Sequence, residues 1–247
     1  HYPIFKLQKD NSFIEFAPSR WWLITQINID CTDILFLNTE TFEDETKNVR
    51  WWIPIMFPNA WPLNDDKIYN LKQHWFARNS SFDYEIYKDK FVMELSSNTE
   101  TKKLFPFDFK LEIIGDFINN WVRITEKITN TWNKPLPTSH WLHPYFFVKN
   151  EVKNDIIFSN LENNFSEVWS TWWTQIIDNP KNFEVDFKTH KIKFNYDQAY
   201  KYVWIWSESE KDFICIEPVI NNENGLIDNP LMIAVWESIE NFVEFRI

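Results

Sequence analysis

The chain has 247 residues, a net charge of −11 and an isoelectric point near 5.0. An acidic chain without a localised basic patch repels phosphates, which excludes nucleic acids and anionic membranes as expected partners. No stretch reaches the roughly 18 uninterrupted apolar residues of a membrane span, and the first residues lack the apolar core of a signal peptide. We therefore expect one cytoplasmic domain over residues 1–247.

Short runs of β character fill the chain, and no sustained helical period interrupts them. In 121–130 and 238–247 apolar and polar residues alternate, as in a half-buried strand. An aromatic strand is also expected near 148, at the end of a turn-rich segment. The other expected strands cover 13–16, 23–29, 34–38, 91–97, 107–114, 155–161, 183–187, 191–196, 201–206 and 212–217. Many short strands joined by turns predict an all-β, large antiparallel sandwich.

The segment 50–78 predicts a strand, a polar loop and a second strand, with charged groups at the ends. It contains Arg50, His74 and Arg78. Binding groups often sit on loops held by a rigid β scaffold. Taken singly, each of these residues could equally be structural or a solvated strand-end charge.

Two further titratable residues stand in apolar strands. His143 precedes a proline, which favours an extended backbone at the histidine. Glu217 ends an apolar strand, where burying a carboxylate is costly without a partner or a task. Each residue also has a structural interpretation: His143 could be a histidine of the core, and Glu217 could form a salt bridge at the end of its strand. Cys31 and Cys215 lack metal-ligand spacing, so we expect buried free thiols and no metal.

Several motifs together resemble the aldose 1-epimerase (galactose mutarotase-like) family. They are VRWWIPIMFPNAWPL, QHWFARNSSF, FPFDFKLEI, ITNTWNKPLPTSHWLHPYFFV and CIEPV, in the family's order and approximate spacing. The resemblance runs from about Pro18 to Glu237 and implies a large antiparallel β supersandwich without a cofactor. It also implies interconversion of the α and β anomers of a sugar.

The resemblance also implies roles for individual residues. Glu217 corresponds to the base that takes the proton from the C1 hydroxyl, and His143 to the acid that protonates the ring oxygen. His74 and Arg78 correspond to sugar-binding residues, and Arg50 to the arginine of the RGGIP element. An acidic sugar-binding residue is expected between the last two motifs, and Asp178 is our choice.

The substrate stays open at this point between a free hexose and a hexose 6-phosphate, whose phosphate two arginines could hold. A third possibility belongs to another class: a non-catalytic carbohydrate-binding β-sandwich whose tryptophans stack on sugar faces. An inactive structural homologue is a fourth. The sequence does not indicate an oligomeric state.

The composition has one abnormal feature, 15 Trp against 2 Gly. Soluble proteins carry about 7% Gly, which for this length is about 17 residues. A set of tryptophans stands where the family pattern has glycine: Trp21, Trp22, Trp51, Trp52, Trp61, Trp75, Trp132, Trp141 and Trp236.

We interpret this substitution as a genetic-code effect. In a lineage that reads UGA as glycine, a translation table that reads UGA as Trp would write Trp at those codons. UGG codons at these positions would refute the interpretation. If the tryptophans are literal, they crowd the site around His74 and His143, and the chain should fold poorly or lack activity.

Overall fold

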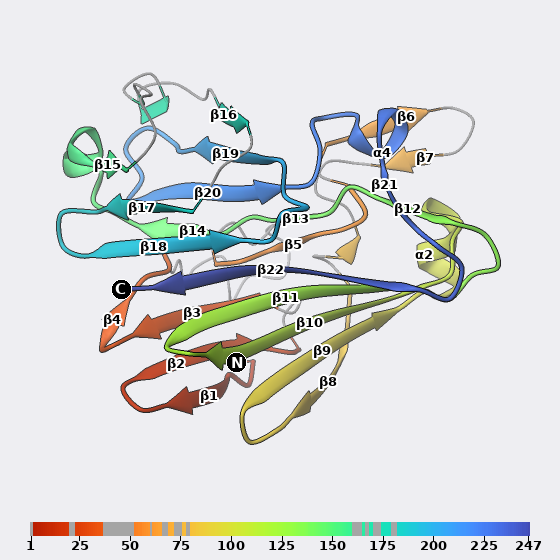
Figure 1. Cartoon of the computed structure of the whole chain (residues 1–247), viewed down its shortest axis with the longest axis horizontal. Coiled ribbons are helices and arrows are strands. Elements are labelled where there is room, and N and C mark those ends of the chain that lie inside the picture. Colours follow the sequence, from red (N-terminus) through yellow and green to blue (C-terminus); the bar gives the residue numbers. More distant parts are fainter. Residues whose placement is uncertain are drawn as a thin grey trace.

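The structure is a computed structural model. It describes residues 2–19, 23–36, 52–59, 61–65, 69–71, 76–77, 80–159, 165, 168–169, 174–178 and 182–247. The described part is built mostly of antiparallel strands, as the alternating pattern predicted (Figure 1). The expected all-β sandwich is confirmed.

Among the described residues, the largest sheet has eight strands in the order β15-β17-β18-β22-β11-β10-β9-β8. The last strand of the chain, β22, lies between β18 and β11 (Figure 1). The strands are β8 (Asp83–Ile86), β9 (Lys90–Ser96), β10 (Phe109–Ile118), β11 (Trp121–Asn130), β15 (Ile157–Phe158), β17 (Phe183–Asp186), β18 (Lys191–Tyr196) and β22 (Ser238–Arg246).

A second sheet faces the first and carries the residues of interest. Within the described part it has six strands, in the order β16-β19-β20-β13-β5 with β14 paired to β20. The strands are β5 (Ile55–Met56), β13 (Trp141–Leu142), β14 (Tyr145–Phe147), β16 (Gln175–Asp178), β19 (Tyr202–Trp206) and β20 (Phe213–Val219).

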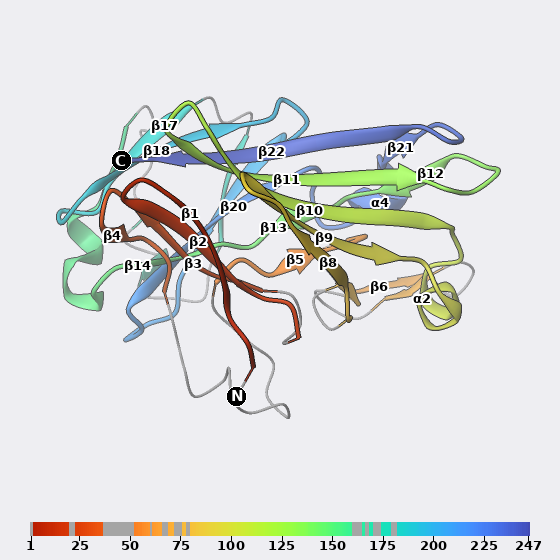
Figure 2. The same cartoon turned by 90° about the horizontal axis from the view of Figure 1, so that it is seen from below.

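Smaller elements surround the two sheets. Figure 2 shows the N-terminal strands β1, β2 and β3 running across the direction of the long strands of the eight-stranded sheet. Isolated bridges join Ile24 of β3 to Ile53, just before β5, and Leu35, just after β4, to Phe146 of β14. The strands are β1 (Phe5–Lys9), β2 (Ser12–Ala17), β3 (Leu23–Ile29), β4 (Thr32–Asp33), β6 (Leu63–Asp65), β7 (Tyr69–Leu71), β12 (Leu136–Thr138) and β21 (Leu231–Ile233); the helices are α2 (Thr99–Leu104), η2 (Asn150–Asp155) and α4 (Gly225–Asp228).

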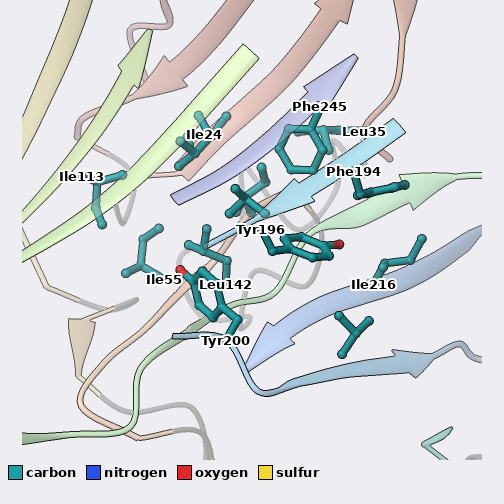
Figure 3. Close-up of a cluster of buried hydrophobic side chains, with 14 of the residues drawn as sticks. Ile24, Leu35, Ile55, Ile113, Leu142, Phe194, Tyr196, Tyr200, Ile216 and Phe245 are labelled. Atoms are coloured by element: carbon teal, nitrogen blue, oxygen red, sulfur yellow. The ribbon is translucent and has the colours of Figure 1, made fainter. Parts of the chain in front are cut away.

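The main core fills the space between the sheets (Figure 3). Ile113 of β10 and Phe245 of β22 come from the first sheet, and Ile216 of β20 and Leu142 of β13 from the second. These four side chains are fully buried. Side chains along a strand alternate between the two faces of its sheet, and these four point into the core. The neighbouring side chains of β20 and β13 therefore point to the opposite face of the second sheet.

Most expected strands are present, with ends shifted by a few residues. Those at 121–130 and 191–196 coincide with β11 and β18. The expected strand at 34–38 is wrong where the structure describes it, because Leu35 forms only an isolated bridge. Cys31 is exposed rather than buried, since it lies in a turn at φ 66°, whereas Cys215 is buried as expected. No helix among the described residues is long and apolar enough to cross a membrane.

Two tryptophans have an unfavourable backbone conformation. Trp52 has φ 78° and Trp236 has φ 63°, in the left-handed region that glycine tolerates and bulky residues avoid. Neither of the two glycines of the chain has positive φ. Both lie instead where a Cβ would clash, Gly115 with the ring of Phe91 at 2.2 Å and Gly225 with a neighbouring Cβ at the same distance.

Candidate functional site

Glu217 lies on β20, on the face turned away from the main core. Ile214 and Ile216 of this strand belong to the main core, so Cys215, Glu217 and Val219 point to the opposite side. Only 3% of Glu217 is exposed. The carboxylate predicted from sequence at a strand end is therefore a buried side chain in the middle of a sheet face.

His143 lies between β13 and β14, beside the same face. Its backbone N–H donates to the carbonyl of Pro54 at 3.2 Å, and the N–H of Tyr145 donates to the carbonyl of Trp52 at 2.8 Å. Pro144 restricts His143 to an extended backbone, which suits this pairing. The register that pairs Tyr145 with Cys215 then brings the histidine next to Glu217.

The two side chains face each other. Nε2 of His143 lies 3.4 Å from Oε1 of Glu217, and 5% of the histidine is exposed. The structure thus brings together the two residues expected to transfer protons. An imidazole and a carboxyl group at this distance can act on two different atoms of one small molecule lying against them.

Aromatic rings wall the pair. The ring of Tyr145 stacks on His143 with centroids 4.7 Å apart and planes 6° apart. Trp141 and Trp206 meet the histidine edge-on, at 5.6 and 6.2 Å. Trp204 is the cross-strand partner of Glu217. These rings exclude water from both titratable groups.

Burial changes the protonation of the carboxyl group. Desolvation raises the pKa of Glu217 well above its ordinary value, because a charged carboxylate loses its hydration there. In the arrangement observed, burial therefore favours the protonated form of Glu217. Glu217 becomes an effective base only when water or a polar substrate reaches it.

Cys215 completes a possible metal-binding group. One donor atom each of His143, Cys215 and Glu217 lies within 4.8 Å of the others. Nitrogen, sulfur and carboxylate oxygen are donors that suit a transition-metal dication. Because metal binding would use the same lone pairs as proton transfer, the two roles would compete at this site.

The structure does not bring Asp178 into contact with this pair. Asp178 ends β16, is exposed, and pairs with Tyr202, which in turn pairs with Val219. The strand register places Asp178 on the same face of the sheet as Glu217. The two residues lie two strands apart, which is about 10 Å across the sheet. The role of Asp178 as a sugar ligand stays a prediction. The predicted ligands Arg50, His74 and Arg78 lie outside the described residues.

Sequence reasoning gave no role to Tyr145, Cys215 or Trp206, although all contact or approach the pair. Tyr145 and Cys215 each stand two residues from His143 or Glu217. In a strand, residues two apart share a face, so this spacing was the available signal. The sequence position of Trp206 gave no such signal, because only the pairing of Trp206 with Cys215 across two strands brings it close to His143.

Comparison with known proteins agrees with this architecture. Residues 58–224, about two thirds of the chain, match the family model of aldose 1-epimerase. The structure resembles the Slr1438 protein from Synechocystis sp. PCC 6803, with a TM-score of 0.88 and 23% identity over 100% of this chain and 96% of that chain.

Two other solved structures share the fold at lower identity. A galactose mutarotase related enzyme from Lactobacillus acidophilus gives a TM-score of 0.78 at 16% identity, over 98% of this chain and 96% of the other. A galactose mutarotase-like protein from Lactobacillus casei ATCC 334 gives 0.77 at 18%, over 99% of both chains. The fold, the motifs and the family match agree: this chain belongs to the aldose 1-epimerase family.

Proposed function

We propose that this chain is an aldose 1-epimerase that interconverts the α and β anomers of a hexose. The observation that carries the proposal is the 3.4 Å separation of His143 Nε2 and Glu217 Oε1 in a buried, ring-walled position. In a cyclic hexose the C1 hydroxyl oxygen and the ring oxygen are bonded to the same carbon. Two proton-transfer groups this close can therefore serve both oxygens at once.

The proposed reaction moves one proton out and one proton in. Glu217, as the carboxylate, takes the proton of the C1 hydroxyl, and the electrons of that O–H bond form the carbonyl of the open chain. The bond from C1 to the ring oxygen breaks, and its electron pair takes a proton from His143. Rotation about the C1–C2 bond and the reverse transfers close the ring as the other anomer, which restores both residues.

A hexose 6-phosphate is the alternative substrate. Arg50 and Arg78 would hold its phosphate, because guanidinium groups bind phosphate oxygens bidentately. In this version the chemistry at His143 and Glu217 is unchanged and only the distal contacts differ. The relative rates on glucose and glucose 6-phosphate, before and after Arg50→Ala, decide between the two substrates.

The burial of three tryptophans beside the site favours an enzyme over a non-catalytic sugar-binding module. A module that stacks indoles on sugar faces needs them exposed. Trp52, Trp141 and Trp204 are at most 2% exposed. A buried acid and base pair is the feature that a binding module does not need.

The test is polarimetry of freshly dissolved α-glucose. We expect the natural protein, with glycine at the tryptophan positions of the family pattern, to accelerate mutarotation. Glu217→Gln in that protein should slow it by about 10²–10⁴-fold, the usual contribution of a general base. Glu126→Gln is the matched control, because Glu126 is an equally buried carboxyl group away from His143. Sugar binding by the parent without acceleration would favour the non-catalytic alternative, and an unchanged rate in Glu217→Gln would refute the assignment of the base.

A further inference from the structure

Three donor atoms of different chemistry meet on the face of β20 that is turned away from the main core. Cys215 and Glu217 stand two residues apart on this strand, so their side chains point to the same side. His143 reaches them from the neighbouring chain segment, because Tyr145 pairs with Cys215. One donor atom of each of the three residues lies within 4.8 Å of the others, and all three residues are buried. Strand pairing therefore assembles an imidazole, a thiol and a carboxyl group that the spacing in the sequence does not connect.

The separations suit a small metal ion. In tetrahedral zinc sites the metal lies about 2.0–2.2 Å from nitrogen or carboxylate oxygen and about 2.3 Å from sulfur, which puts the donor atoms about 3.3–3.6 Å apart. Nε2 of His143 and Oε1 of Glu217 lie 3.4 Å apart. The sulfur of Cys215 lies within 4.8 Å of the other donors, so it has to approach them by at most about 1.5 Å. A change of one cysteine rotamer moves the sulfur further than this.

The donor set selects the kind of ion. A thiolate and a carboxylate together neutralise a dication, so the occupied site carries no net charge and is compatible with burial. Nitrogen and sulfur donors favour zinc and related transition metals, whereas Mg²⁺ and Ca²⁺ require about six or more oxygen ligands. Three protein ligands leave the fourth tetrahedral position for a water molecule. The site therefore fits Zn²⁺ and does not fit an alkaline-earth ion.

The surroundings hold the donors in place. The ring of Tyr145 stacks on the imidazole of His143 with the planes 6° apart, which restricts the orientation of the imidazole. Cys215 packs with Tyr145 and Phe213 in one apolar cluster. None of the three donor residues stands at a tryptophan position of the family pattern. The donor set is therefore the same with tryptophan or with glycine at those positions.

We propose that His143, Cys215 and Glu217 form a site for Zn²⁺ or a similar thiophilic dication, and that the bound ion inhibits the enzyme. Coordination uses the lone pairs of the imidazole and the carboxylate, which are the lone pairs that exchange protons with a substrate. Metal binding and proton transfer therefore exclude each other. The inhibition rests on the proposed function, whereas the metal site does not.

Metal binding is tested with Co²⁺, a spectroscopic substitute for Zn²⁺, on the natural protein kept reduced. A coordinated thiolate adds a sulfur-to-metal charge-transfer band in the near ultraviolet, which nitrogen and oxygen ligands do not give. We expect this band in the natural protein and in Cys31→Ser, and no band in Cys215→Ser. Cys31 is the matched control, because it is the other cysteine of the chain and is exposed. A band that is kept in Cys215→Ser, or no band in the natural protein, would overturn the site.

Competition with a chromophoric zinc chelator measures the affinity. Loss of an outer partner of a metal ligand already costs about 10- to 100-fold, so loss of the thiolate should weaken Zn²⁺ binding at least about 100-fold. Cys215→Ala provides the same test without a buried hydroxyl, and circular dichroism shows whether both variants are folded. Unchanged Zn²⁺ affinity in the two variants would overturn the sulfur ligand.

Polarimetry with added Zn²⁺ tests the inhibition. At ten times the dissociation constant about nine-tenths of the molecules hold the ion, so the rate of mutarotation should fall about tenfold, and a chelator should restore it. The ratio of the rates with and without Zn²⁺ is compared between variants, so that a change in basal rate cancels. The ratio should stay near one in Cys215→Ala at the same concentration, and Mg²⁺ should not slow the natural protein. A rate that rises with Zn²⁺ and is lost in the chelator would overturn the inhibition.

The two measurements separate this proposal from the proposed function. A sulfur band in a protein that does not accelerate mutarotation would support the metal site and contradict the epimerase. Acceleration that Zn²⁺ does not change, with no sulfur band, would support the epimerase and overturn the metal site.

Discussion

Two buried pairs of a carboxyl group and an imidazole occur in this molecule, on opposite sides of the second sheet. His143 and Glu217 face each other at 3.4 Å on the side turned away from the main core. His140 and Glu126 lie 3.9 Å apart between the two sheets, and both are fully buried. The residue types, the burial and the distance are similar, so chemistry alone does not distinguish a catalytic pair from a structural one.

The core histidine has a complete set of hydrogen bonds within the protein. Asn241 donates through Nδ2 to Asp197 at 3.0 Å, so its Oδ1 is an acceptor and His140 Nε2 must carry the hydrogen that bonds it at 3.0 Å. Thr138 Oγ1 then donates to the other ring nitrogen of His140 at 3.1 Å. Both nitrogens are used within the protein, which leaves the ring no atom for a substrate.

Protonation in the core pair follows from the same burial. Desolvation raises the pKa of Glu126 to about 8, although the hydroxyl of Tyr200, which donates to it at 2.7 Å, lowers it. Desolvation lowers the pKa of His140 to about 3. Both groups are therefore neutral near pH 7. The core pair is a closed structural network, and the pair on the outer side is the one that we propose meets a ligand.

The largest expected effect tests whether the two histidines differ in role. His143→Asn should lower the rate of anomerisation by about 10²–10⁴-fold, because it removes the group proposed to protonate the ring oxygen. His140→Asn should leave the rate per folded molecule within a few-fold of the parent. Polarimetry at a temperature where both variants are folded checks this. Equal losses would mean that the comparison between the two pairs is wrong.

Glu126 should make stability fall as pH rises. Its folded pKa of about 8 exceeds the reference value of 4.5, so the native state holds a proton that the unfolded state has released between these values. Its contribution is present below pH 4.5 and is lost progressively up to about 8. From pH 6.5 to 8 this amounts to about 2 kcal/mol. Urea unfolding should show this loss in the parent and not in Glu126→Gln; equal slopes would contradict it.

His140 should act in the opposite direction at lower pH. Its folded pKa of about 3 lies below the reference value of 6.5, so the unfolded state gains a proton that the native state does not. Its contribution is present above pH 6.5 and is lost as pH falls toward 3. Between pH 6.5 and 5.5 the loss is about 1 kcal/mol. His140→Gln should lack this loss, and the difference from the parent in urea unfolding measures it.

The smallest expected effect concerns the ring stacked on the histidine proposed to be catalytic. Tyr145→Leu removes the ring stacked on His143, and such pairs contribute about 0.5–1.5 kcal/mol, so the turnover rate should fall about 2- to 12-fold. Phe147→Leu, two residues further along β14 and exposed, is the matched control. A similar loss in both variants would mean that β14 acts through its general packing.

Local signals in the sequence determined much of the fold. Alternation of apolar and polar residues located β11 residue by residue, because side chains in a strand point to opposite faces with a period of two. Helix α2 was missed, since six residues are too few to show a helical period, although Asn98 caps it through two backbone N–H groups. The edge strand β8 was missed because all four of its residues are exposed.

The candidate site depended on both the sequence and the tertiary structure. His143 and Glu217 could be chosen from the sequence by residue type, neighbouring proline and resemblance, and so could the tryptophans at glycine positions. Only the tertiary structure decided that these two meet, because the register of β14 on β20 joins residues far apart in the chain. It also placed Glu126 beside His140 and indole rings beside His143 and Glu217. Such contacts depend on pairing between distant strands, whereas alternation along one strand is local and can be read directly from its residues.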